Sequence, residues 1–361
     1  MINFKKHNFQ SLCLIAALFL FSCEDENMAP DLPVVGEEGF YVVNEGGWGH
    51  GNTSISYFNK LTGSIVNDIY YLANNNTPLG DQAQSMSILD TLGYISVQNS
   101  GKIEVVDINS FQSVTTIDED IVSPRYIVGY NSDKAYVSDW GDGFSSFVRV
   151  IDLTTNEVTK SISTGAGTNQ LLIHDDKLYA VNAGGFDRDN TMVIINTSTD
   201  ELVNTIELGD NPNSLQIDAD GNIWVLCGGY TAYDENWNVD LENSTKGSLI
   251  QLNSSGQELL NLSLAEFSKP DHLSITQDGQ SLFYLYNSGI YKIDITASEL
   301  PTTPFIDKSF YGLGIDPVNG NIIGCEAPDF TSAGNVIQYA EDGSMIETIS
   351  VGIAPNNITY K

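Results

Sequence analysis

The sequence predicts an all-β fold, namely a seven-bladed β-propeller whose blades are four-stranded antiparallel sheets. Short strands rich in Val and Ile alternate with Gly- or Asn-containing turns and polar loops. This unit recurs seven times at a spacing of roughly 40 to 60 residues, which is typical of propeller blades. The two ends of the repeating region also carry complementary parts of one blade, so we expect the ring to close.

The clearest blade lies near the middle of the chain. Its four strands are expected at 170–173, 177–182, 191–196 and 201–207. Parts of the same pattern return on both sides, at 135–138 with 148–152 and at 221–225 with 248–252. Trp224 lies inside one of these strands, so we expect it in the core of a blade.

The strand that comes first in the chain has the pattern of the second strand of a blade, so the innermost strand of its blade must come from elsewhere. Residues 40–43 have this form, whereas residues 354–360 resemble 211–217, where an innermost strand begins. We therefore expect a propeller domain over residues 40–361, closed by its C-terminal strand. Closure removes the exposed sheet edges through which open β-arrays associate, and we expect a monomer.

Residues 1–22 have the pattern of a lipoprotein signal peptide. Lys5 and Lys6 give a basic start, residues 12–21 are apolar, and the segment ends at Cys23 in a lipobox-like context. Ten apolar residues are too few for a membrane-spanning helix, which needs roughly 20. An ordinary secretory signal with an incidental cysteine is the alternative.

We expect Cys23 to be lipidated and residues 23–39 to form a flexible acidic linker. A lipid on Cys23 anchors a protein without spanning the bilayer. The acidic residues 24–26 resemble surface-export signals of bacterial lipoproteins. The predicted location is the outer membrane, with the propeller facing the cell exterior and a periplasmic orientation as the alternative.

Charge and cysteine content narrow the possible partners. The chain has 15 Lys and Arg against 47 Asp and Glu, a formal net charge of −32. Such a charge repels nucleic acids and anionic lipids, so we expect no nucleic-acid partner. Cys227 and Cys325 fall on strands two blades apart and are predicted to be buried free thiols.

No catalytic or metal-binding pattern stands out. His50, His174 and His272 have no second His or Cys at metal-ligand spacing, and no Gly-x-Ser-x-Gly motif occurs. Asp-Gly pairs, such as Asp278-Gly279, are interpreted as tight hairpin turns and not as calcium ligands. We expect no metal, no cofactor and no enzymatic activity.

Large aromatic residues gather in the loops of one predicted face. Gly-Gly pairs precede Trp48, Phe186 and Tyr230, and the longest loop spans residues 227–247. These rings either bind a ligand or cap the blades; as a set they favour a binding face. The predicted ligand-binding residues are Glu45, Trp48, Arg125, Trp140, Phe144, Phe186, Arg188, Tyr230, Tyr233 and Trp237. Further polar candidates on this face are Asp139, Asp142, Asp187, Asp189, Asn190, Asp234 and Asn236.

The connectors between blades form a second predicted ring, nearest the central channel. They are residues 75–77, 123–126, 168–170, 211–213, 269–272, 310–311 and 355–357. Their amides and hydroxyls suit a ligand that is rich in amides or hydroxyls. Arg125 is either a ligand contact or a structural plug paired to carboxylates.

The blade pattern in residues 177–215 resembles the YVTN or YncE-like propeller repeat, over essentially all of residues 40–361. Residues 43–49, 52–58 and 123–127 are similar to surface lipoproteins of the BtuG-like cobalamin-capture type. The resemblance implies a propeller that captures a nutrient outside the cell and passes it to a TonB-dependent outer-membrane transporter. The aromatic residues would then contact cobalamin or a related corrinoid. A glycan-binding or adhesive propeller and a lactonase- or lyase-type enzyme are the alternatives.

Overall fold

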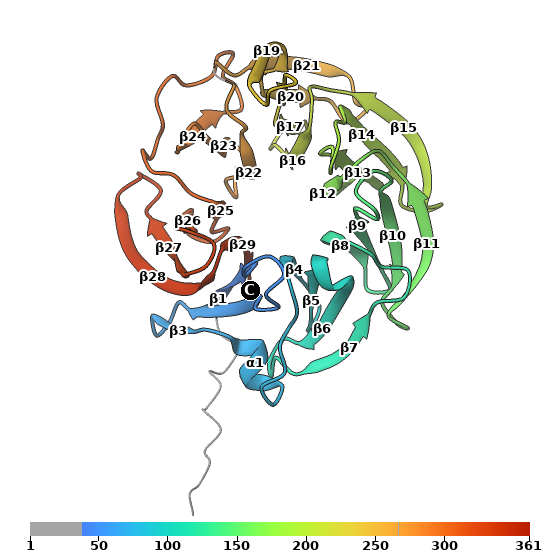
Figure 1. Ribbon diagram of the computed structural model, residues 1–361, viewed down its shortest axis with the longest axis vertical. Helices are drawn as coiled ribbons and strands as arrows, with labels where there is room; N and C mark the ends of the chain where they lie inside the picture. The colour runs from blue at the N-terminus through green and yellow to red at the C-terminus, as the bar shows by residue number, and fades with distance from the viewer. Residues whose placement is uncertain (1–37, 266) are drawn as a thin grey trace, which may run out of the picture. The chain divides into compact units, whose positions relative to one another are not determined.

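The computed structural model describes residues 38–265 and 267–361, all of which belong to one compact unit. Seven antiparallel sheets are arranged around a central axis (Figure 1). The predicted all-β class and seven-bladed propeller are therefore confirmed. The predicted signal peptide 1–22, Cys23 and the linker up to residue 37 lie outside the described residues. Within the part of the chain described, no helix has the length and apolar character needed to cross a membrane.

Each blade is a sheet whose strands follow one another from the central axis to the outside of the ring. The first four blades are, from the inside out, β29 (Pro355–Tyr360), β1 (Gly39–Asn44), β2 (Ser54–Asn59) and β3 (Ser64–Val66); β4 (Ala83–Leu89), β5 (Leu92–Val97), β6 (Lys102–Asp107) and β7 (Ser113–Ile117); β8 (Pro124–Asn131), β9 (Lys134–Asp139), β10 (Phe147–Asp152) and β11 (Glu157–Ser163); and β12 (Thr168–His174), β13 (Lys177–Asn182), β14 (Thr191–Asn196) and β15 (Glu201–Glu207).

The other three blades are β16 (Pro212–Ile217), β17 (Ile223–Cys227), β20 (Ser248–Leu252) and β21 (Glu258–Ser263); β22 (Asp271–Ile275), β23 (Ser281–Tyr286) and β24 (Gly289–Asp294); and β25 (Gly312–Ile315), β26 (Ile322–Glu326), β27 (Ala333–Tyr339) and β28 (Met345–Ile353). A separate hairpin, β18 (Tyr230–Tyr233) and β19 (Val239–Thr245), lies between β17 and β20. Helix α1 (Ile69–Ala73) and the 3₁₀ turn η1 (Gln98–Ser100) are short additions to the loops.

The C-terminal strand closes the ring, as predicted. β29 pairs antiparallel with β1, and Phe40 faces Tyr360 while Val42 faces Ile358. Because β1 to β3 come from the start of the described chain, this blade is built from both ends of the propeller (Figure 1). The contact makes the ring a closed structure without a free first or last sheet.

The sixth blade departs from the four-stranded pattern. Its sheet contains three strands, and the fourth place is taken by an isolated bridge between Ile290 and Ile306. Pro301 and Pro304 lie in the segment that would supply the outer strand. Proline cannot donate a backbone hydrogen bond, so this segment cannot form a regular ladder.

The apolar core lies between neighbouring blades. Middle strands are buried on both faces, and β13 and β17 are examples. Tyr179 and Met192 of the fourth blade pack with Val225 of the fifth. Trp224 is fully buried against the sixth blade, and its indole N–H donates to Asp218 over 2.9 Å. Its predicted place in the core is confirmed, and burial of each such side chain contributes roughly 1.5–3 kcal/mol.

The two described cysteines are buried and free, as predicted. Cys227 lies in β17 and Cys325 in β26. Burial raises the pKa of the Cys227 thiol to about 12, and it raises the pKa of the Cys325 thiol as well. Both thiols therefore remain protonated, and they act as small apolar groups of the core.

The hairpin turns within a blade are short and are stabilised by hydrogen bonds between their own residues. Asp278, between β22 and β23, accepts from the Gln280 backbone N–H over 3.0 Å, and Gly279 has φ +67°. The pairs Asp220-Gly221 and Asp342-Gly343 also lie at hairpin turns. Their interpretation as hairpins is confirmed, and the carboxylates of Asp278 and Asp342 accept hydrogen bonds from the local backbone.

Candidate functional site

The long loops and the connectors between blades meet at one end of the ring. The guanidinium of Arg125, at the start of β8, lies 4.3 Å from the ring centre of Trp140, which follows β9. Tyr311, just before β25, packs against Phe330 of the β26–β27 loop with ring centres 4.9 Å apart. The predicted sharing of one face by these two kinds of loop is therefore observed in two separate blades.

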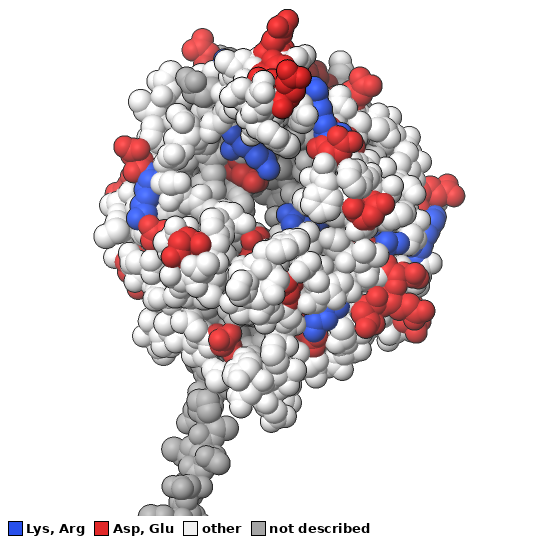
Figure 2. All heavy atoms as spheres, viewed as in Figure 1, with Lys and Arg blue, Asp and Glu red and all other residues white. Residues whose placement is uncertain are grey.

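A cavity of about 320 Å³ opens where these loops meet the central channel. Figure 2 shows the hollow at the centre of the ring, with acidic and basic side chains around it. A second cavity, of about 260 Å³, continues along the channel and shares Tyr126, Asp271 and His272 with the first. The polar residues that line the first cavity include Glu45, Arg125, Asn169, Lys269, Asp271, His272, Tyr311 and Asn356.

Glu45 is the most enclosed charged group of this cavity, with 6% of its surface exposed. The Tyr311 hydroxyl donates to its Oε2 over 2.7 Å, and the Asn356 side-chain amide donates to Oε1 over 2.6 Å. Burial raises the pKa of Glu45, and the Tyr311 hydrogen bond together with the charges of Arg125 and His272 opposes the rise. Tyr311 and Asn356 come from the seventh blade connector and β29, so ring closure completes this group.

His272 extends the same hydrogen-bond chain. The Asn356 side chain donates through its nitrogen to Glu45, so its Oδ1 accepts from His272 Nε2, at 2.9 Å. The other ring nitrogen, Nδ1, is buried and has no hydrogen-bond partner among the described residues. His272 lines both cavities, and a carboxylate oxygen of Asp271 lies 3.7 Å from its Nδ1.

The backbone at His272 is also unusual. Its φ of +56° lies in the left-handed region, which costs a non-glycine residue about 1 kcal/mol or more. The paired strands β22 and β23 shift register between Asp271 and Ser274 at this point. The fold therefore retains a strained conformation at a residue that faces the channel.

Arg125 is held by neutral groups. Its Nη1 donates to Gln98 Oε1 over 2.6 Å and its Nε donates to Asn169 Oδ1 over 3.3 Å. The interpretation as a plug paired to carboxylates is wrong, because no carboxylate of the described residues forms an ion pair with Arg125. Arg125 lines the cavity, and its charge is not neutralised by direct contact.

Trp140, the aromatic residue that contacts this arginine, belongs to a cluster with two other predicted aromatic residues. Phe186 packs on Trp140 and on Phe144, each with ring centres 6.1 Å apart. Phe144 and Phe186 remain 60% and 65% exposed. The β9–β10 and β13–β14 loops thus present an aromatic cluster that includes the ring over Arg125.

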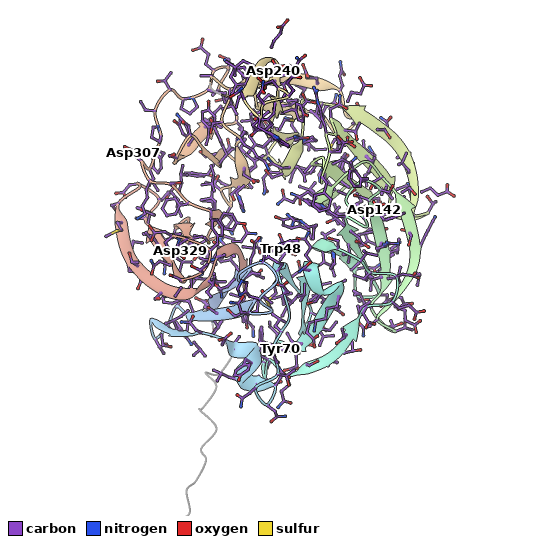
Figure 3. The ribbon with its side chains drawn as sticks, in the orientation of Figure 1. Trp48, Tyr70, Asp142, Asp240, Asp307 and Asp329 are labelled. Carbon is purple, nitrogen blue, oxygen red and sulfur yellow. The ribbon has the colours of Figure 1, made fainter. Side chains whose placement is uncertain are left out.

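Trp48 occupies the β1–β2 loop and is 63% exposed. Figure 3 shows it on the inner side of the ring, beside the central opening. The loop is fixed by Gly47 N–H donating to Asn52 Oδ1 and Gly49 N–H donating to Asp81 Oδ2, both at 2.9 Å. Gly46 has φ +78°, and a Cβ there would lie 2.5 Å from Asn52, so glycine is required.

The remaining predicted aromatic residues form a separate group on the fifth blade. Tyr233 and Trp237 of the β18–β19 hairpin contact each other, with ring centres 6.2 Å apart. Trp237, 83% exposed, lies at the hairpin turn with φ +65°. Tyr230 packs against Arg188, whose guanidinium pairs with Asp210 over 2.6 Å. Figure 3 labels Asp240 of this hairpin far from the central opening, so this hairpin extends away from the cavity.

Several polar candidates have structural roles. Asp139 is fully buried and pairs with Arg149 over 2.8 Å. Asp142 accepts from the backbone N–H groups of Phe144 and Ser145, which lowers the pKa of its carboxyl. Asp234 accepts from two backbone N–H groups of its own turn, over 2.8 and 2.9 Å. These carboxylates shape the loops that carry the aromatic rings.

Six of the seven predicted connectors contribute residues to one or both channel cavities. The exception is residues 75–77, which follow α1 and bond to it through the Asn76 N–H to the Tyr71 carbonyl, over 2.9 Å. Lys269, Asp271, His272, Tyr311 and Asn356 were not among the predicted ligand-binding residues. The sequence feature that could have identified them is their place just before or within the innermost strand of a blade, often beside a proline.

Within residues 38–265 and 267–361, no three His, Cys, Asp or Glu side chains are grouped so that they could hold a metal ion. The cavity is instead lined by hydrogen-bonding and charged groups from several blades. Its residues can bind a polar group, and its aromatic border can bind an apolar one.

Residues 38–350 match the family described as Domain of unknown function (DUF5074). The chain belongs to this family. No curated protein matches the sequence. The match covers the ring except the end of β28 and the closing strand β29, so the family model and the propeller describe nearly the same part of the chain.

Solved structures of similar fold include proteins with different names. A quinonprotein alcohol dehydrogenase-like protein of Bacteroides thetaiotaomicron has a TM-score of 0.65 and 14% identity, over 90% of this chain and 78% of its own. A periplasmic gluconolactonase of Pseudomonas aeruginosa has a TM-score of 0.63 and 11% identity, over 89% and 99%. A functionally unknown protein of Desulfotomaculum acetoxidans has a TM-score of 0.64 and 12% identity, over 90% and 99%. At such identities the likeness shows a shared fold.

Proposed function

We propose that this protein is a non-enzymatic ligand-binding propeller, with its site at the mouth of the central channel. The observation that carries the proposal is the cavity of about 320 Å³ with Trp48 at the inner side of the ring and the Trp140–Phe186 cluster beside Arg125. Exposed rings beside a concave polar site are typical of small-molecule recognition. The ligand would place a polar group in the cavity and an apolar part on the rings.

The position of the polar groups supports binding more directly than it supports catalysis. Glu45, Asn356 and His272 form one hydrogen-bond chain between blades, and Arg125 is fixed by two amides. Such groups are held in place before a ligand arrives, which reduces the entropy lost on binding. A ligand rich in amides or hydroxyls would form hydrogen bonds with the polar side chains that line the cavity.

Cobalamin or a related corrinoid is the first ligand to examine. The sequence resembles cobalamin-capture surface lipoproteins at residues 43–49 and 123–127. Residues 45, 48 and 125 lie in or beside the candidate site. In this proposal, the lipid-anchored propeller faces the cell exterior and passes its ligand to a TonB-dependent outer-membrane transporter.

Titration of the purified propeller with cyanocobalamin and cobinamide tests the proposal, with corrin absorbance and tryptophan fluorescence as readouts. We expect saturable quenching by at least one corrinoid. Saturation by oligosaccharides and not by corrinoids would support the glycan-binding alternative. No saturable binding of either class would contradict the proposed ligands.

The anchor has its own test. Replacing Cys23 with Ala in the full-length chain should move the protein from membranes to the soluble fraction, because the thiol that would carry the lipid is lost. Melting temperature should be unchanged, since the propeller begins after residue 37. Cell fractionation with a surface-protease assay measures both anchoring and orientation; membrane retention of the variant would contradict lipidation.

A lactonase-type activity is the second candidate, and one observation favours it. His272 and Glu45 line the same cavity as Arg125, and these three residues could act as base, acid and electrostatic stabiliser. One protein of similar fold is named a gluconolactonase. Hydrolysis of glucono-δ-lactone that is abolished in H272A would support this activity over simple binding.

A further inference from the structure

The protein uses its few arginines in two different ways. Arg149 pairs with Asp139 over 2.8 Å and Arg188 pairs with Asp210 over 2.6 Å. Arg125, the third arginine, has no ion pair among the described residues. In a chain with 47 acidic and 15 basic residues, an arginine without a carboxylate partner is notable, because partners are abundant.

The guanidinium of Arg125 is oriented without being neutralised. Gln98 and Asn169 accept from Nη1 and Nε through neutral amide oxygens, and the indole of Trp140 covers one face. Nη2 has no hydrogen-bond partner among the described residues. A fixed guanidinium with free N–H groups matches the geometry of carboxylate and phosphate oxygens.

Lys269 supplies a second cation to the same cavity. It precedes Pro270 and β22, whereas Arg125 comes from β8, so the two charges enter the cavity from different blades. Within the described part of the chain, Lys269 forms no ion pair. Basic side chains are visible at the central hollow in Figure 2, although acidic groups dominate the sequence.

The two carboxylates of the cavity are hydrogen-bonded to other groups. Both Glu45 oxygens accept hydrogen bonds, from Asn356 and Tyr311, and burial raises the pKa of this carboxyl. Asp271 Oδ1 accepts from the His272 backbone N–H over 2.9 Å and lies 3.7 Å from His272 Nδ1. Neither forms an ion pair with Arg125 or Lys269.

We propose that the central cavity binds an anionic group of the ligand, a carboxylate or a phosphate, between Arg125 and Lys269. This inference rests on the proposed function, since it specifies the chemistry of the same site. The aromatic border then holds the uncharged remainder of the ligand.

Calorimetric titration with three related probes tests this proposal. Glucuronate carries a carboxylate, glucose 6-phosphate carries a phosphate, and glucose is their neutral counterpart. We expect one or both anions to bind, with affinity that falls as salt rises, and glucose to bind at least about tenfold more weakly. The better anion identifies which of the two groups the cavity prefers.

Variants then locate the binding. R125Q and K269Q should each weaken the bound anion by about tenfold or more, whereas R125K should recover part of the affinity because it keeps the charge. K160Q is the matched control, since it removes the same charge from the outer strand β11. K269Q also guards against misfolding, because Lys269 forms no ion pair within the described part of the chain, and circular dichroism should confirm the fold of every variant.

The outcomes separate this inference from the proposed function. Equal binding of glucose and the anions, no binding of either anion at millimolar concentration, or an equal loss in K160Q would overturn the anion site. Corrinoid or glycan titrations with W48A test the aromatic border separately. Loss of ligand in W48A with no anion preference would retain the proposed function and refute this inference.

Discussion

The two ends of the propeller use their polar side chains differently. At the hairpin end, Asp152 and Asp278 bond to the backbone two or three residues away. At the channel mouth, Tyr311 reaches Glu45 across 266 residues of sequence and His272 reaches Asn356 across 84. The hairpin groups are satisfied locally and serve folding, whereas the mouth groups are brought together by the ring and leave atoms available to a ligand.

Removal of β29 should have the largest effect, because this strand both closes the ring and contributes to the channel mouth. Deletion of residues 354–361 should lower the free energy of unfolding by more than about 3 kcal/mol, since it exposes β1 and removes Asn356 from the mouth. Thermal and urea unfolding measure the loss. Deletion of Lys361 alone is the control, and an unchanged midpoint in the longer deletion would contradict the closure.

Replacing the exposed rings changes the mouth and leaves the hairpin end intact. W48A and F186A should weaken ligand binding by about 1–3 kcal/mol, because each removes a large apolar contact. Their melting temperatures should remain close to wild type, since both side chains are mainly exposed. S255A, in the turn between β20 and β21, should bind normally. Early melting with normal binding would instead identify the two rings as blade caps.

Replacing a polar side chain at the hairpin end should lower stability and leave ligand binding unchanged. D152A removes an acceptor for the Thr154 and Thr155 backbone N–H groups and for the Thr154 hydroxyl. We expect a small loss of stability and no change in ligand affinity. Denaturant unfolding and titration of the same preparation check both parts; weaker binding would show that the two ends are coupled.

The smallest effect concerns pH. The pKa of Glu45 is raised above its ordinary 4.5 by burial, so the folded state holds this proton more strongly than the unfolded state. Its contribution is therefore present below pH 4.5 and is lost as pH rises through the folded pKa. The E45Q variant stays neutral and should not show this loss. The difference in melting temperature between the two proteins across mildly acidic pH measures it, and parallel curves would contradict the prediction.

Much of the fold could be predicted because its signals are local. Strands such as 177–182 carry their own Val and Ile pattern and their own turns, and residues 354–360 match 211–217 closely enough to show the closure. The missing outer strand of the sixth blade was not predicted, although Pro301 and Pro304 are visible in the sequence. The β18–β19 hairpin was read as a loop, since its polar residues 234–238 dominate the pattern.

The site was harder to predict because its contacts are distant in sequence. Trp48 and Arg125 could be named from their neighbours, but the partners of Glu45 come from Tyr311 and Asn356, which no local spacing connects. The aromatic set was expected as one face, and its members form at least two groups. Which of these residues binds a ligand remains a prediction for the variants above.

The hydrogen bond between Asn356 and Glu45, 311 residues apart, also bears on the order of folding. Contacts of such separation form late, because the chain between them must be organised first. Intermediates with several blades but no closure would contain Arg125 and His272 and would lack the arrangement that holds them. Ligand present during refolding should therefore act only at the final step, by slowing the reopening of the ring.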